Sequence, residues 1–143
     1  MHFFLDPPPD FVCLSKLDEV TLHTNTPQSS SFAQVASIVS LDLDFLTETV
    51  DPLVSLPNLR CLRLNVAGHG VLISKSFQLI LGRLTSLNLR CWEPIDLPAE
   101  FGTQASQLKT LSLTNFLLNH GTYVIQSLQN LSSLTMRSCI GSE

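Results

Sequence analysis

The side chains that enzymes use as nucleophiles, general bases and metal ligands are few and scattered in this chain. It has four histidines and four cysteines among 143 residues. Pairs such as Cys61 with His69 and Cys91 with His120 lack the close spacing of a zinc site. The sequence also lacks a glycine-rich phosphate loop, a nucleophile elbow and the helical motif of zinc proteases. We therefore expect no enzymatic activity, no metal site and no cofactor.

Other polar residues occur at regular places along the chain. They lie between or directly after pairs of apolar residues, in the alternation typical of a half-buried β-strand. Carboxylate, guanidinium, amide and hydroxyl groups in such positions bind a partner through charge and hydrogen bonds. The candidate partner-binding residues are Asp42, Asp44, Arg63, Asn65, Asn88, Arg90, Ser112 and Arg137.

The elements that carry these residues follow a repeated apolar pattern. Apolar residues at the first, fourth and sixth positions recur in six windows, which start at Leu17, Ile38, Leu59, Leu84, Leu108 and Leu131. Successive starts are 21 to 25 residues apart. Each window predicts a short strand whose alternate residues point inward. One such unit cannot bury its leucines alone, but stacked units share a continuous core.

This pattern resembles that of the leucine-rich-repeat family over residues 13–143. The resemblance implies an α/β fold, a right-handed solenoid of about six repeats with a parallel β-sheet on its concave face. The family places Asn or Cys three residues after the last core leucine, and Asn25 and Cys139 match that position. The middle four repeats carry Leu46, Ala67, Trp92 and Phe116 there. Such irregular copies are similar to those of F-box substrate receptors or intracellular immune receptors.

The segments between the strands are long enough for helices or irregular turns. We expect helices over Ser30–Ile38, Ile73–Leu81 and Thr122–Leu128. We expect less regular connections at Asp51–Leu56 and Glu93–Ala105, which contain prolines.

Three further residues lie where the repeated strands turn into the connections. Trp92 and Phe116 are expected to fill the core between successive turns, and the alternative is that they are exposed aromatic contacts for a partner. His69, between two glycines, is expected in a flexible loop.

Stacking of the units would align the outward-facing residues in two columns across the sheet. One column would contain Thr21, Asp42, Arg63, Asn88, Ser112 and Thr135, and the other His23, Asp44, Asn65, Arg90, Thr114 and Arg137. Asp42 would face Arg63, and His23 would face Asp44. Phe45, Val66 and Cys91 would form an apolar flank. The alternative is a merely solvated sheet face with weak ion pairs between neighbouring strands.

The two ends of the chain depart from the repeat. Residues 1–12, which contain three consecutive prolines, are expected to be an extended lead-in. No polar capping unit follows the last repeat, so the chain is expected to be a fragment or to be covered by a partner there. Uncapped terminal repeats would also permit end-to-end association of copies.

Charge and cysteine usage narrow the partners and the compartment. The net charge is −4, which disfavours binding to nucleic acid or to an acidic membrane surface. Cys61 and Cys91 would lie five positions apart along neighbouring strands, roughly 16 Å at about 3.3 Å per residue. A disulfide tolerates about 7 Å between Cα atoms, so the two should remain free. Free thiols favour an intracellular location, cytoplasmic or nuclear, although the sequon at Asn130 points weakly the other way.

These observations favour non-catalytic protein recognition through the concave face. The resemblance suggests substrate recognition for an F-box-type ubiquitin-ligase adaptor. The alternatives are the ligand-sensing repeat region of an intracellular immune receptor and an architectural fragment without its own partner. An extracellular receptor ectodomain would require paired cysteines in terminal caps.

Overall fold

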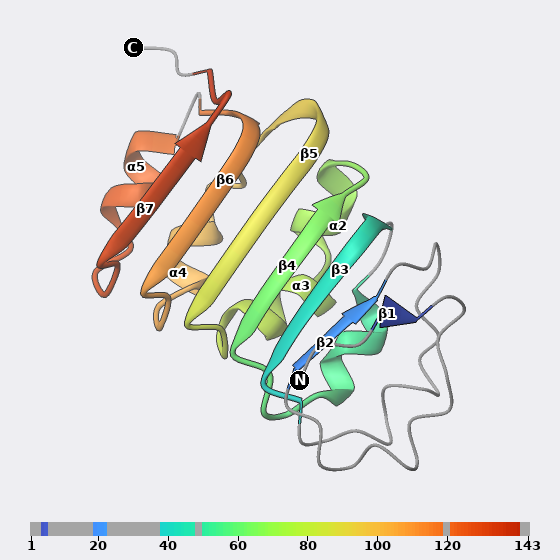
Figure 1. Ribbon diagram of the computed structural model, residues 1–143. Helices are drawn as coiled ribbons and strands as arrows, with labels where there is room; N and C mark the ends of the chain where they lie inside the picture. The colour runs from blue at the N-terminus through green and yellow to red at the C-terminus, as the bar shows by residue number, and fades with distance from the viewer. Residues whose placement is uncertain (1–3, 6–18, 23–37, 48–49, 119–120, 141–143) are drawn as a thin grey trace.

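The computed structural model describes residues 4–5, 19–22, 38–47, 50–118 and 121–140. For residues 4–5, 19–22, 44–47, 52 and 121–122 it describes the backbone alone. These residues form an α/β fold built on a parallel sheet, as the sequence predicts (Figure 1). The sheet has seven strands, and their order in the sheet is their order in the chain.

The strands of the six predicted units all take part in this sheet. They are β2 (Glu19–Leu22), β3 (Ser40–Thr47), β4 (Cys61–Val66), β5 (Ser86–Asp96), β6 (Thr110–Leu117) and β7 (Ser133–Arg137). The lead-in adds a short strand that the sequence did not predict, β1 (Phe4–Leu5), which pairs with β2. The rest of the lead-in lies outside the described residues.

The register aligns equivalent apolar positions across the sheet. One column contains Leu41, Leu62, Leu87, Leu111 and Leu134, and the next contains Leu43, Leu64, Leu89, Leu113 and Met136. Alternate residues of a strand point to opposite faces, so both columns lie on one face of the sheet. Leu64, Leu89 and Leu113 are completely buried there.

The backbone repeats one hydrogen-bond arrangement at the start of four strands. The carbonyl of Val39 accepts from the N–H groups of Arg60 and Cys61 at 2.8 and 2.9 Å. The carbonyls of Arg60, Thr85 and Lys109 each accept from two consecutive N–H groups of the next unit, at 2.8 to 3.0 Å. Each of these units therefore fixes the position of the one that follows.

The helices lie on the face of the sheet that carries the leucine columns (Figure 1). They are η2 (Asp51–Ser55), α2 (His69–Ile73), α3 (Lys75–Leu81), α4 (Phe101–Gln104) and α5 (Gly121–Gln126). Phe77 and Phe101 from these helices are fully buried in the same core. Among the described residues, no helix has both the length and the apolar character needed to cross a membrane.

The predicted connections are confirmed in part. Ser74 accepts a hydrogen bond from the Phe77 N–H at 3.2 Å, so α3 begins at Lys75 rather than at the predicted Ile73. Helix α5 lies at the predicted place, whereas nearly all of the predicted helix Ser30–Ile38 falls outside the described residues. The expectation of a flexible loop at His69 is wrong, because this residue begins α2.

The prediction for the two aromatic turn residues is confirmed for Phe116 and wrong for Trp92. Phe116 is fully buried, whereas Trp92 is 74% exposed. Asn115 has a φ of 66°, and this left-handed residue reverses the alternation of β6 so that Phe116 points inward. In β5 the alternation continues, so Cys91 fills the core and Trp92 points away from it.

Two other expectations about the sheet are corrected. Val66 and Cys91 are buried on the helix-covered side, because they continue the inward alternation, and so they do not form an apolar flank on the other face. In β3 the register shifts between Leu43 and Leu46, so Asn65 pairs with Leu46 instead of aligning with Asp44. The longer strand β3 accommodates its extra residues in this irregularity.

Candidate partner-binding face

The candidate site is the sheet face opposite the helices, which we call the open face. Its described side chains come from alternate positions of β3 to β7: Asp42, Arg63, Asn65, Asn88, Arg90, Ser112, Thr114, Thr135 and Arg137. They point to this face because the apolar residues before and after each of them in the strand point toward the core. Period-two alternation therefore both builds the core and presents the polar residues.

The register aligns these side chains in two rows across the strands. In the first row, Arg63 pairs with Asp42 on one side and Asn88 on the other, and Ser112 and Thr135 follow. In the second row, Asn65 pairs with Arg90, and Thr114 and Arg137 follow. Parallel strands are about 4.8 Å apart, so members of a row are direct neighbours.

The expected contact between Asp42 and Arg63 is present. Arg63 Nη1 donates to Asp42 Oδ2 at 3.3 Å. The Asp42 side chain is 32% exposed and the Arg63 side chain is 41% exposed. Water therefore screens the ion pair, which stabilises the fold by less than about 1 kcal/mol. Its main effect is to neutralise one cation at the β3 side of the face.

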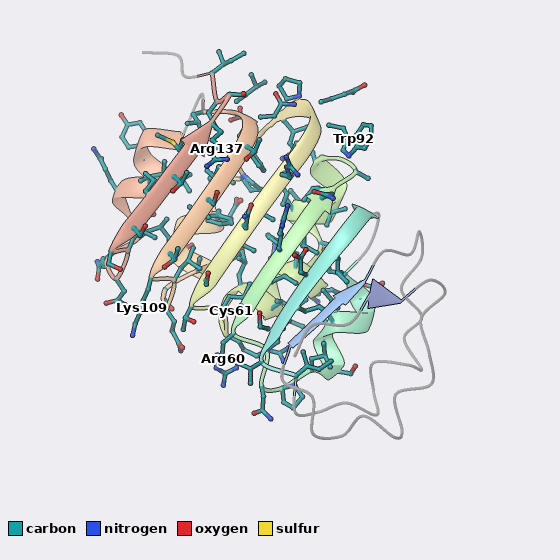
Figure 2. All side chains as sticks on the ribbon, viewed as in Figure 1. Arg60, Cys61, Trp92, Lys109 and Arg137 are labelled. Atoms are coloured by element: carbon teal, nitrogen blue, oxygen red, sulfur yellow. The ribbon has the colours of Figure 1, made fainter. Side chains whose placement is uncertain are left out.

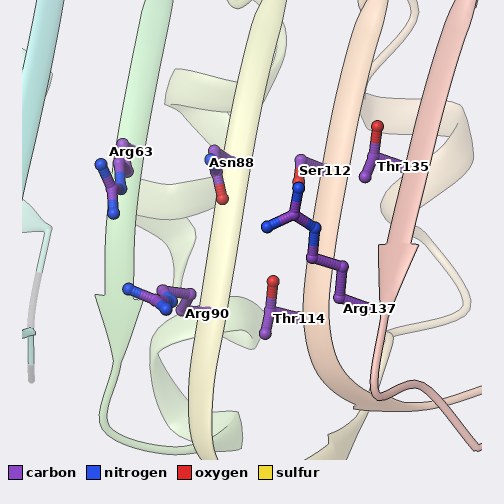
Figure 3. A pocket seen from close by; sticks show the side chains of 7 residues that line it. All are labelled: Arg63, Asn88, Arg90, Ser112, Thr114, Thr135 and Arg137. Carbon is purple, nitrogen blue, oxygen red and sulfur yellow. The ribbon is translucent and has the colours of Figure 1, made fainter.

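A cavity of about 260 Å³ opens on this face (Figure 3). Five of the predicted partner-binding residues line it together with two threonines of the predicted columns: Arg63, Asn88, Arg90, Ser112, Thr114, Thr135 and Arg137. Arg137 extends from β7 back across β6, so that its guanidinium group lies beside Ser112 in this view (Figure 3). The cavity is therefore built from four successive strands, β4 to β7.

The lining of the cavity is cationic and rich in hydrogen-bond donors. Three guanidinium groups contribute to it, and no carboxylate does. Arg63 pairs with Asp42, whereas Arg90 and Arg137 are exposed and form no ion pair with any residue that the structure describes. Such a lining can hold an anion by charge-assisted hydrogen bonds.

The remaining predicted site residues either lie beside the cavity or have side chains outside the described part of the molecule. Asp42 borders it through Arg63, and Asn65 occupies the second row next to Arg90. The side chain of Asp44 is outside the described part of the molecule, as is His23. The structure therefore does not test the expected contact between His23 and Asp44.

Asn115 is a structural residue of this region that the sequence analysis did not single out. Its amide donates to the carbonyls of Cys91 at 3.0 Å and Trp92 at 3.1 Å, in the preceding unit. Asparagine tolerates left-handed backbone better than most residues do. Ser138, which directly follows β7 as Asn115 follows Thr114, also has a positive φ of 52°. The only sequence signal was an amide-bearing residue directly before the aromatic Phe116.

The thiols that the structure describes are those of Cys61, Cys91 and Cys139. Burial, and secondarily the nearby Cys139, raise the pKa of Cys91 to about 12, so its thiol stays protonated at neutral pH. Cys139 donates to the Leu113 carbonyl at 3.5 Å. The register pairs Cys91 with Val66 and Cys61 with Ser86, which confirms the predicted separation of Cys61 from Cys91, and both are free.

Metal ligands are also not gathered in the part of the chain that the structure describes. No group of three or more His, Cys, Asp or Glu side chains there could hold a metal ion. The cavity on the open face offers guanidinium, amide and hydroxyl groups for binding. Comparison with known proteins gives no family: no family model matches the chain. No curated protein matches it either.

Proposed function

We propose that the chain is a right-handed leucine-rich-repeat solenoid whose open face is its concave, protein-binding surface. The observation that carries this function is the cationic cavity built by equivalent positions of four consecutive strands. Residues that face outward have no role in the core. Their convergence around one hollow therefore favours recognition over a merely solvated face.

The repeated architecture supports the solenoid. The sequence pattern, the two apolar columns and the recurring pair of backbone hydrogen bonds all have the same period. Each unit then contacts mainly its neighbours, as in a quasi-one-dimensional stack. Strands that follow one another in a parallel sheet also require crossovers, for which the right hand is strongly favoured.

A non-catalytic role agrees with the chemistry of the face. A nucleophile needs an adjacent base, and the residues that line the cavity include no histidine, cysteine or carboxylate. Arginine and polar side chains are instead common anchors in protein interfaces. We expect the partner to be a protein with an acidic contact segment, and we expect the chain to act in the cytoplasm or nucleus.

The more specific role rests on the resemblance of the irregular repeats. We propose substrate recognition for an F-box-type ubiquitin-ligase adaptor. The repeat region of an intracellular immune receptor is the alternative from the same resemblance. An architectural fragment without a partner is the alternative that a binding experiment excludes most simply.

The test is affinity capture from a native lysate with three baits. These are the parent chain, Arg90→Glu/Arg137→Glu, and the charge-matched control Lys75→Glu/Lys109→Glu. Lys75 and Lys109 are exposed and do not line the cavity, and Figure 2 shows Lys109 near the start of the strands, at the end opposite to Arg137.

We expect one set of proteins to be captured by the parent and the control and lost with the arginine reversal. Ubiquitin-ligase subunits in that set support the adaptor role. The same proteins on all three baits would show that the open face is not the binding surface, and no captured protein would favour the architectural fragment.

A further inference from the structure

We infer that the cavity on the open face binds a phosphoryl group carried by a serine or threonine side chain of the partner segment. This assignment rests on the proposed function and specifies the chemistry of the partner. It follows from the charge, the donor arrangement and the size of the cavity.

The charge of the lining fits a dianion better than a single carboxylate. The ion pair with Asp42 balances Arg63. Two guanidinium groups, Arg90 and Arg137, then remain without an ionic partner among the residues the structure describes. A phosphoryl group on serine carries about −1.5 to −2 charges at pH 7, which balances both. One carboxylate would leave one of the two cations uncompensated.

The donors of the lining fit the oxygens of a phosphoryl group. Arg90 and Arg137 lie in one row with Thr114 between them, and both line the cavity. Their planar guanidinium groups extend from β5 and β7 toward the preceding strands (Figure 3). Hydroxyl groups of Ser112, Thr114 and Thr135 add neutral donors. A phosphoryl group offers three strong acceptor oxygens, and arginine binds it in a bidentate manner.

The size of the cavity favours a group attached to a larger partner. Its volume of about 260 Å³ is below the range of roughly 300–1,000 Å³ that is usual for pockets that enclose a whole small-molecule ligand. The surrounding rows of the open face continue to Asp42 and Asn65, where flanking residues of a peptide can lie. A modified side chain within an extended segment therefore fits the hollow and its borders.

The experiment measures binding of three peptide libraries that are degenerate except for a fixed central residue: phosphoserine, serine or glutamate. The parent chain is compared with Arg90→Gln/Arg137→Gln and with the matched control Lys75→Gln/Lys109→Gln. Arg90→Lys/Arg137→Lys retains the charge and removes the forks. Circular dichroism melts verify that each variant is folded, which we expect because Arg90 and Arg137 are exposed.

We expect the parent and the control Lys75→Gln/Lys109→Gln to retain the phosphoserine library at least about ten-fold more than the serine and glutamate libraries. The glutamine variant should lose this preference, and the lysine-for-arginine variant should keep only part of it. Equal retention of the phosphoserine and glutamate libraries would overturn the phosphoryl assignment. A phosphoserine preference that survives Arg90→Gln/Arg137→Gln would show that the group binds elsewhere.

Phosphatase treatment of the lysate separates this assignment from the proposed function. Capture that is lost after treatment supports both. Capture that persists after treatment and still depends on Arg90 and Arg137 would overturn the phosphoryl assignment and leave protein recognition by the open face intact.

Discussion

At the residue scale, the outward-facing side chains were predictable from the sequence. The residue that reverses the alternation of inward and outward side chains within a strand was not. Arg63, Asn88 and Ser112 follow from period-two alternation, because burial of their leucine neighbours determines their direction. Trp92 and Phe116 occupy the same place in the pattern yet differ in burial. The left-handed backbone at Asn115 makes this difference, and no pattern of apolar residues encodes it.

The role of Asn115 predicts different costs for two substitutions. Asn115→Gly tolerates the φ of 66° and loses only the hydrogen bonds to the carbonyls of Cys91 and Trp92. Asn115→Ala loses the same bonds and also strains the backbone, so it should cost about 1–2 kcal/mol more in the free energy of unfolding. Urea denaturation of both variants measures the difference. Equal stabilities would mean that the left-handed conformation is not held in the native state.

The raised pKa of Cys91 predicts how stability depends on pH. The native thiol has a pKa of about 12 and the unfolded one a value near 9.0, so above pH 9 the unfolded chain binds fewer protons than the native chain. The Cys91 contribution to stability is therefore complete below pH 9 and is lost as the pH rises toward 12.

Cys91→Ala should lower stability at neutral pH but reduce the loss between pH 9 and 11 relative to the parent. Denaturant unfolding of both proteins at several pH values gives the two slopes. Parallel slopes would show that Cys91 does not titrate differently in the folded and unfolded chains.

At the element scale, the strands were predictable and the short helices only in part. The six windows predict six strands that the structure contains. The windows that start at Ile38, Leu59, Leu84 and Leu108 bury their apolar triplets between the sheet and the helices. The connecting helices are only four to seven residues long where described, too short for a clear helical period. Local capping, such as that by Ser74, decides where they begin.

The packing of α4 against α5 makes Gly102 an essential small residue. A Cβ atom there would clash with Ser127 Oγ and would lie 2.5 Å from the Val124 carbonyl oxygen. Gly102→Ala should therefore destabilise the fold by about 1–3 kcal/mol, because the backbone of α5 must shift.

The double variant Gly102→Ala/Ser127→Ala separates the two contacts. It removes the clash with Ser127 Oγ and leaves the contacts with the Val124 carbonyl oxygen at 2.5 Å and with the Cβ of residue 127 at 3.0 Å. Gly102→Ala should therefore still destabilise the Ser127→Ala protein, but by less than it destabilises the parent. Thermal melts of the four proteins give these differences. Unchanged stability in Gly102→Ala would contradict the close approach of the two helices.

At the scale of the whole molecule, coverage by neighbouring units decides how much each leucine contributes. Leu62 and Leu134 occupy the same column, but Leu62 is 3% exposed and Leu134 is 37% exposed. Met136 of β7 and Ile140, which follows this strand, are 47% and 60% exposed, so this side of the sheet is apolar and uncovered by the residues that the structure describes. We propose that copies of the chain can associate end to end through this side.

This gradient predicts opposite outcomes for two identical substitutions. Leu62→Asp places an unpaired charge in the middle of the core at a cost of several kcal/mol, comparable with the total stability of a domain, and should unfold the chain. Leu134→Asp should cost about 1 kcal/mol or less and should weaken concentration-dependent self-association. Circular dichroism and sedimentation velocity measure both. A cooperative melt of Leu62→Asp close to that of the parent would contradict the stacked architecture.

The central claim is that the open face binds a protein partner, and one binding measurement tests it most directly. A partner recovered by the parent chain is titrated against the parent, Arg90→Glu/Arg137→Glu and Lys75→Glu/Lys109→Glu. We predict equal affinities for the parent and the lysine variant and a loss of at least about ten-fold for the arginine variant. Equal affinity for all three folded proteins would place the binding surface away from β4 to β7 and contradict the account.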